Sequence, residues 1–107
     1  MVEKDQNSSV NNELSESSTV LVVEDDEGLS RLIKKSLETI GVNVKAVHSG
    51  ADAIDFIVNH SPLITLLDYR LPDMTASQIV QDLKGRKIDF QFIVMTGHGD
   101  ERVAVEM

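Results

Sequence analysis

The fold is decided by residues 63–68, Leu-Ile-Thr-Leu-Leu-Asp, a run typical of a buried strand that ends at a carboxylate. A charge is costly to desolvate, so Asp68 in this position indicates a function or a partner nearby. A similar run, Thr-Val-Leu-Val-Val at residues 19–23, is followed by four acids at residues 24–27. If the two strands are parallel neighbours, Asp68 and these acids meet at one edge of a sheet. A hard divalent cation relieves the repulsion between clustered carboxylates, which predicts a magnesium site and phosphate chemistry.

Composition sets broad limits on the function. The 107 residues are enough for one domain, and 41% of them are hydrophobic, which suffices for a modest core. The net charge of -8 opposes nucleic-acid binding and suits cations or basic protein partners. The absence of Cys excludes disulfides, thiolate catalysis and Cys-zinc sites. No apolar run is long enough for a membrane span or a signal peptide, so we expect a cytoplasmic protein with no membrane contact.

Strands and amphipathic helices alternate along most of the chain. Residues 1–18 are polar, and we expect a disordered tail there, with a short helix around residues 10–17 as the alternative. The apolar spacing then predicts the following elements. They are a strand at 19–23, a helix at 27–40 closed by Gly41, a strand at 42–47, a helix between Ser49 and Pro62, a strand at 63–67, a helix at 75–84 ended by Gly85, a strand at 90–95, and a helix that starts at a cap on Asp100 and continues to Met107.

This alternation predicts an α/β fold with a parallel sheet and right-handed crossovers. In such sheets, functional side chains collect at the carboxyl ends of the strands. The unusual residues of this chain stand at such positions: Glu24, Asp25 and Asp26 after the first strand, Asp68 after the third, and Thr96 after the fourth.

Three segments together resemble the receiver domain of two-component response regulators. They are Val-Val-Glu-Asp-Asp at 22–26, Leu-Asp-Tyr-Arg-Leu-Pro-Asp-Met at 67–74, and Val-Met-Thr-Gly-His at 94–98. Each motif alone is weak, but the three in this order, each at a strand end, are a specific signal. The resemblance covers residues 19–107. It implies a flavodoxin-like doubly wound sheet with strand order 2-1-3-4, containing four of the five βα units that the family has.

The resemblance also implies a role for each matching residue. Asp68 matches the phosphoacceptor, an ionised carboxylate nucleophile that takes a phosphoryl group from a histidine kinase or a phosphotransfer protein. Asp25 would ligate Mg²⁺ directly, Glu24 would act mainly through bound water, and the backbone carbonyl of Arg70 would be a further ligand. Thr96 matches the switch hydroxyl that bonds a phosphoryl oxygen. Beyond this autocatalytic chemistry, the resemblance implies no enzyme activity.

The chain departs from the family pattern in two places. Ala76 stands where the family usually has Gly. The family also has a fifth strand that ends in a Lys beside the acceptor, whereas Lys84 and Lys87 fall in the wrong part of this topology. We therefore expect the strand at 90–95 to be an exposed edge and one sheet face to lack a helix. The chain alone should then be poorly stable or should self-associate through that edge.

Other readings of the same residues stay open at this point. The acids at 24–27 could serve as an acidic helix start, and we expect this role for Asp26 in particular. The missing Lys favours a second function, a pseudo-receiver interaction module that is not phosphorylated. A haloacid-dehalogenase-like hydrolase is disfavoured, because Arg70 stands where that group needs a second acid. We expect His48 and His60 to be ordinary surface residues.

Overall fold

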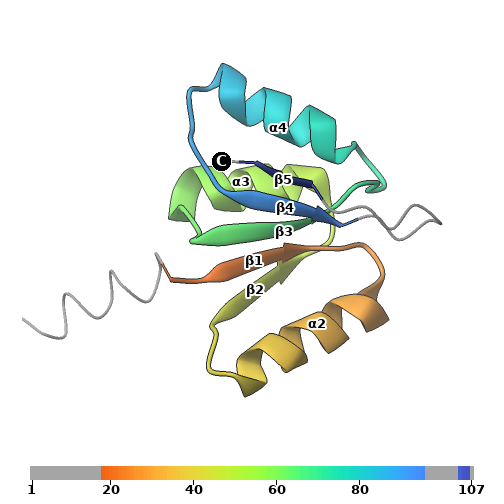
Figure 1. Ribbon diagram of the computed structural model, residues 1–107. Coiled ribbons are helices and arrows are strands. Elements are labelled where there is room, and N and C mark those ends of the chain that lie inside the picture. Colours follow the sequence, from red (N-terminus) through yellow and green to blue (C-terminus); the bar gives the residue numbers. More distant parts are fainter. Residues whose placement is uncertain (1–17, 96–103, 107) are drawn as a thin grey trace, which may run out of the picture.

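The computed structural model describes residues 18–95 and 104–106, which form one sheet with helices on both faces (Figure 1). Its elements are β1 (Val20–Val23), α2 (Glu27–Thr39), β2 (Val44–Val47), α3 (Gly50–His60), β3 (Ile64–Asp68), α4 (Ala76–Gly85), β4 (Phe92–Met95) and β5 (Ala104–Glu106). The strand order is β2-β1-β3-β4-β5, and the first four strands are parallel. The expected α/β fold and the order 2-1-3-4 are therefore confirmed.

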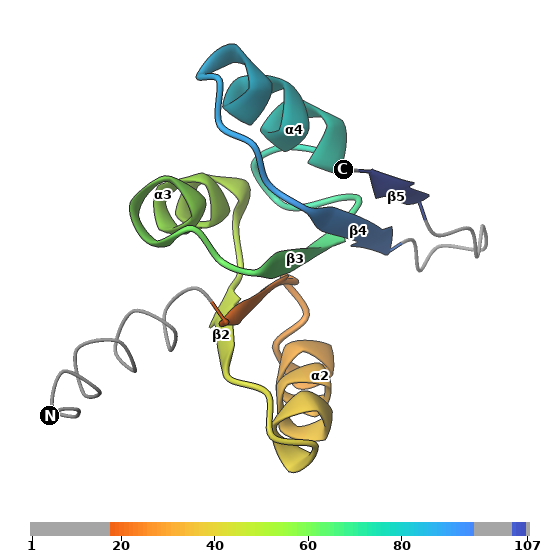
Figure 2. The same ribbon diagram turned by 60° about the vertical axis from the view of Figure 1, so that its left-hand side comes forward.

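The direction of each crossover explains where the helices lie. The chain moves one way across the sheet from β1 to β2, and the opposite way from β2 to β3 and from β3 to β4. Because such crossovers are right-handed, the first helix must lie on one face and the next two on the other. Figure 2 shows this arrangement, with α2 on one side of the sheet and α3 and α4 on the other.

The main core lies between the sheet and the pair α3 and α4. It takes alternate residues of the strands, because successive side chains of a strand point to opposite faces. Its buried members are Leu21, Val23, Val47, Ala53, Ile54, Ile57, Leu67, Ala76, Ile79, Leu83, Phe92 and Val94. The methyl group of Ala76, at the position where Gly was expected, is thus part of this core and only 1% exposed.

On the other face of the sheet, α2 leaves part of its own apolar stripe exposed. This helix lies against β1 and β2, over the buried side chains of Val20 and Val22. The helical stripe predicted from the sequence is present, but Leu29 is 43% exposed and Leu32 is 62% exposed. Ser30 is the buried residue of α2. Within the described residues, part of the apolar stripe of α2 therefore stays exposed, while the β1 side chains beneath the helix are buried.

Local capping chemistry accounts for the helix boundaries. Asp26, Ser49 and Thr75 are the N-caps of α2, α3 and α4, and each side chain accepts a hydrogen bond from a backbone N–H of the first turn. Gly41 follows α2 with φ of +87°, a backbone conformation that a residue with a Cβ rarely adopts. The expected starts of these three helices are confirmed to within one residue, whereas α4 extends through Gly85 and is capped by Arg86.

The end of the chain differs from the expectation. Residues 104–106 were expected to be helical, but they form β5, which pairs antiparallel with β4. The predicted exposed edge at β4 is therefore wrong in this structure. The physical reason is that an open strand edge presents unpaired N–H and C=O groups, and a short antiparallel segment satisfies them.

Two further expectations concern the termini and membranes. The tail predicted at residues 1–18 lies, apart from Ser18, outside the described residues, and so does the helix start predicted at Asp100. Among the helices that the structure describes, none has the length and apolar character needed to cross a membrane.

Candidate acidic metal and phosphoacceptor site

Asp68 is the last residue of β3 and is only 6% exposed. It lies between β1 and β4 in the sheet order and is in register with Met95 of β4. The next residue continues the backbone pairing, since the Tyr69 N–H donates to the Met95 carbonyl oxygen at 3.0 Å. Asp68 is thus held by backbone hydrogen bonds at the carboxyl edge of the sheet, with little freedom to move away from its neighbours.

Glu24 and Asp25 directly follow β1, the strand beside β3. The Glu24 N–H donates to the Val47 carbonyl oxygen at 3.1 Å, which extends the β1–β2 pairing by one residue. The side chain of Glu24 is buried, whereas Asp25 is exposed. Because β1 and β3 are parallel, their carboxyl ends lie at the same edge, and these two acids face Asp68.

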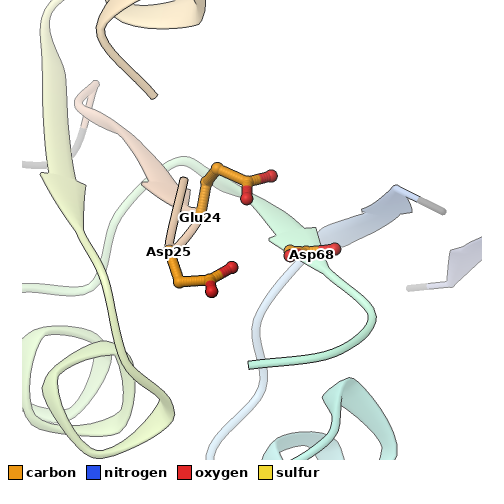
Figure 3. Close-up of side chains that lie close together, drawn as sticks. All are labelled: Glu24, Asp25 and Asp68. Atoms are coloured by element: carbon orange, nitrogen blue, oxygen red, sulfur yellow. The ribbon is translucent and has the colours of Figure 1, made fainter. Parts of the chain in front are cut away.

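Figure 3 shows the three carboxylates together. One oxygen of each of Glu24, Asp25 and Asp68 can be chosen so that all three atoms lie within 4.8 Å of one another. The structure thus brings together the residues that the sequence placed at one edge. Their individual roles remain predictions.

The electrostatics of Glu24 reflect this crowding. Burial is the largest cause that raises the pKa of its carboxyl above the ordinary value of 4.5, and the nearby charges of Asp68 and Asp25 raise it further. A hydrogen bond to Asp68 acts in the same direction. The opposing cause is the Asp26 N–H, which donates to Glu24 Oε2 at 3.1 Å. The cluster therefore holds negative charge at a cost in free energy that a bound cation would relieve.

The donor set fits a hard divalent cation. All three side chains offer carboxylate oxygens, the ligands that Mg²⁺ prefers, and Mg²⁺ keeps several waters, so few protein ligands are needed. The mix of two buried acids and one exposed acid gives the site an open side toward solvent.

Asp26 and His48 form hydrogen bonds that hold the loop after β1, but they are not part of the cluster of three carboxylates. The Asp26 carboxylate accepts a hydrogen bond from the Leu29 N–H at 3.0 Å, as expected for a helix cap. His48 lies 2.8 Å, through Nδ1, from the backbone carbonyl oxygen of Glu24. Because a carbonyl only accepts, Nδ1 is the donor. His48 is exposed, as expected for a surface residue, and it also ties the loop after β2 to the loop after β1.

The loop from Tyr69 to Thr75 carries Arg70, whose carbonyl is a predicted Mg²⁺ ligand. Arg70 is exposed and forms an isolated bridge with Thr75. Sequence reasoning missed Asp73, whose carboxylate accepts hydrogen bonds from the Gly50 N–H at 2.8 Å and the Ala51 N–H at 2.9 Å. An acid before a helix is a common surface feature, and no local pattern connects it to residues more than 20 positions away.

Two other expectations concern Thr96 and the Lys that the family has beside the acceptor. Thr96 lies outside the described residues, so its switch role stays a prediction. Lys84 lines a surface pocket with Pro62 and Leu63, which precede β3. At about 3.3 Å per residue, Leu63 is about 16 Å from Asp68 along the strand. Lys84 is therefore at the opposite end of the sheet, in agreement with the expectation that it does not pair with Asp68.

Comparison with known sequences identifies the family. A family model described as the response regulator receiver domain matches residues 20–107. The chain is 38% identical over 85 residues to the regulatory protein LuxO of Vibrio vulnificus, a match that covers 79% of this chain and 19% of that protein. It is 31% identical over 87 residues to the response regulator MprA of Mycobacterium tuberculosis, covering 79% of this chain and 38% of MprA. The chain thus spans about a fifth of the length of LuxO.

Solved structures agree with this assignment. The signal receiver domain of a putative LuxO repressor protein from Vibrio parahaemolyticus matches with a TM-score of 0.71 at 32% identity, covering 78% of this chain and 64% of that one. The MaeR response regulator bound to beryllium trifluoride matches with a TM-score of 0.69 at 28% identity, covering 78% and 70%. The fold, the acids at the edge of the sheet and the comparisons all lead to the same conclusion. The chain belongs to the response regulator receiver domain family.

Proposed function

We propose that this chain is the phosphoacceptor module of a two-component phosphorelay and that Asp68 is the acceptor. The observation that carries the proposal is the position of Asp68, a buried carboxylate at a strand end with two further carboxylates within 4.8 Å. A structural role does not require three acids so close together, because their mutual repulsion raises the free energy of the folded chain.

In the proposed reaction, a carboxylate oxygen of Asp68 attacks the phosphorus of a phosphohistidine. A new P–O bond forms while the P–N bond breaks, and the imidazole leaves with the electron pair. The attack needs an ionised carboxylate with a fixed direction of approach. The backbone pairing of Tyr69 with Met95 supplies that fixed position, directly beside the nucleophile.

We propose that Glu24, Asp25, Asp68 and the Arg70 carbonyl hold Mg²⁺. When bound, Mg²⁺ would neutralise charge on the phosphoryl oxygens. The chain's part is to hold its acids at a common edge, with the Asp26 N–H orienting one oxygen of Glu24. The structural relative MaeR was solved with beryllium trifluoride bound. We propose that beryllium trifluoride binds to the present chain at Asp68.

Partner, output and switch also belong to the proposal. The donor is a histidine kinase or a phosphotransfer protein, and Thr96 is the switch hydroxyl that responds to phosphorylation. We propose no enzyme activity for this chain apart from its own phosphorylation and dephosphorylation. The LuxO and MprA relatives are much longer than this chain, and we propose that the output of this protein comes from residues outside the receiver domain.

The test is phosphorylation by acetyl phosphate in the presence of Mg²⁺, followed by intact-mass analysis. The parent protein should gain one phosphoryl group, and Asp68→Asn should gain none. Asp89→Asn is the matched control, since Asp89 is an exposed acid on the loop before β4. The proposal fails if Asp68→Asn is labelled as well as the parent. Saturable Mg²⁺ binding is a second expected result, and its absence together with absent labelling would favour the pseudo-receiver alternative.

A further inference from the structure

The N-terminus of α3 is completed by a side chain from another loop. Within α3, Ser49 accepts a hydrogen bond from the Asp52 N–H at 3.1 Å. The N–H groups of Gly50 and Ala51 precede the first helical carbonyl partners, so they need acceptors from elsewhere. Asp73 supplies both, with Oδ1 2.8 Å from the Gly50 nitrogen and Oδ2 2.9 Å from the Ala51 nitrogen. Both oxygens of the Asp73 carboxylate thus accept hydrogen bonds from the N-terminus of α3.

The charge state of Asp73 agrees with this geometry. The hydrogen bond from the Gly50 N–H is the largest cause that holds the pKa of Asp73 below its ordinary value of 3.8, with a further contribution from the Ala51 N–H. At neutral pH the side chain is therefore a carboxylate. Charge-assisted hydrogen bonds of this kind are stronger than those between neutral groups.

Close packing beside Asp73 reinforces the contact. Met74 is half-buried and lies against Gly50 and the main core. A Cβ atom at Gly50 would fall 2.6 Å from the Met74 Sδ and would also overlap Cγ. A residue with a Cβ at position 50 would therefore force the Met74 side chain to shift, and the hydrogen bonds and the packing act on adjacent residues.

The loop that Asp73 anchors is the one that follows Asp68. It is closed on itself, because the Leu71 N–H donates to the Met74 carbonyl oxygen at 3.1 Å and Arg70 is bridged to Thr75. Its base is fixed by the Ala76 N–H, which donates to the Tyr69 carbonyl oxygen at 2.8 Å. These contacts connect the backbone of Arg70 with that of the residues next to Asp73.

We propose that Asp73 is a positioning residue for the acidic site: by anchoring the loop to α3, it sets the place of the Arg70 carbonyl relative to Asp68. The inference rests on the proposed function, because it assigns the anchored loop a part in Mg²⁺ binding. Asp73 touches neither the metal nor the phosphoryl group, and its effect passes through the backbone between residues 70 and 73.

The test is isothermal titration of Mg²⁺ into the full-length protein and its variants, at a temperature where circular dichroism shows each to be folded. Because supporting residues around metal ligands are worth roughly 10–100-fold in affinity, we expect Asp73→Ala to weaken Mg²⁺ binding by about 10-fold. Asp73→Asn keeps one acceptor and should be intermediate. Gly50→Ala should weaken binding by the separate route of pushing Met74 away. Asp52→Asn, which removes a charge from the same helix end, should keep the parent's affinity.

The outcomes separate the inference from the function on which it rests. If Asp73→Ala and Gly50→Ala lower the melting temperature but keep the parent's dissociation constant for Mg²⁺, Asp73 is purely structural and the inference is wrong. If Asp73→Ala does not fold, the Mg²⁺ dissociation constants of Asp73→Asn and Asp52→Asn are compared instead. Equal values would again mean that Asp73 is purely structural. If the parent neither binds Mg²⁺ nor accepts a phosphoryl group, the proposed function itself fails.

Discussion

Replacing Asp68 by Asn should make the metal-free domain more stable, because it removes a charge from a crowded cluster. Two unit charges 4.8 Å apart repel by about 1 kcal/mol at the dielectric constant of water and about 3.5 kcal/mol at an effective value of about 20. Asp68 faces two such charges, and the same repulsion is one of the causes that raise the pKa of Glu24. We therefore expect a gain of about 1–3 kcal/mol in the free energy of unfolding at neutral pH.

The assay is urea unfolding of the receiver domain, followed by circular dichroism, once with a chelator and once with Mg²⁺. With the chelator, Asp68→Asn should unfold at a higher urea concentration with an unchanged m-value. Mg²⁺ at tenfold above its dissociation constant should stabilise the parent by about 1.4 kcal/mol and the variant by far less. Asp89→Asn should behave like the parent. The reasoning is refuted if Asp68→Asn is no more stable than the parent without metal, or if Mg²⁺ stabilises both equally.

Three further predictions test the site and the core. The raised pKa of Glu24 contributes stability below its unfolded value of 4.5 that is lost as pH rises through the folded-state pKa, so the metal-free domain should lose stability as pH rises above 4.5. Urea titrations of Glu24→Gln should lack that fall, and an identical pH profile would contradict this. The lowered pKa of Asp73 has the opposite sign: its stabilisation is present above 3.8 and is lost as pH falls through the lower folded-state pKa. Acid unfolding of Asp73→Asn should therefore show a weaker dependence on pH in that range, and an unchanged dependence would speak against the two hydrogen bonds. Leu83→Ala, in the fully buried core, should cost about 2–5 kcal/mol, whereas Leu32→Ser on the exposed side of α2 should stay within about 0.5 kcal/mol, as measured by thermal or urea unfolding. Equal losses would mean that the α2 face is buried in solution.

Much of the fold could be predicted because its signals are local. The caps Ser49 and Thr75 each bond an N–H three residues away. A helix start of this kind depends on a short stretch of sequence and can be recognised there. The same holds for residues 63–68, where a carboxylate after a buried run predicts the strand and its functional end together. The site was predictable to the same extent, because parallel strands place their carboxyl ends at one edge.

Neighbouring acids show where this reasoning needed the structure. Asp25 and Asp26 are identical in type and adjacent in sequence, yet only Asp25 lies within reach of Asp68. The carboxylate of Asp26 is used by the Leu29 N–H at the start of α2. The sequence indicated this division of roles, and the structure shows the hydrogen bond that produces it.

By itself, the sequence determined the alternation of strands and helices, the parallel direction of the first four strands, and the edge at which Glu24, Asp25 and Asp68 meet, whereas the order of the strands followed from the resemblance to receiver domains. These features depend on apolar periodicity and on residues next to one another in the chain. Only the tertiary structure decided two other features. They are the hydrogen bond from the Gly50 N–H to the carboxylate of Asp73, 23 positions away, and the antiparallel pairing of residues 104–106 with β4. In both cases the backbone groups were satisfied by partners distant in sequence, and the choice among such partners is made by packing in three dimensions.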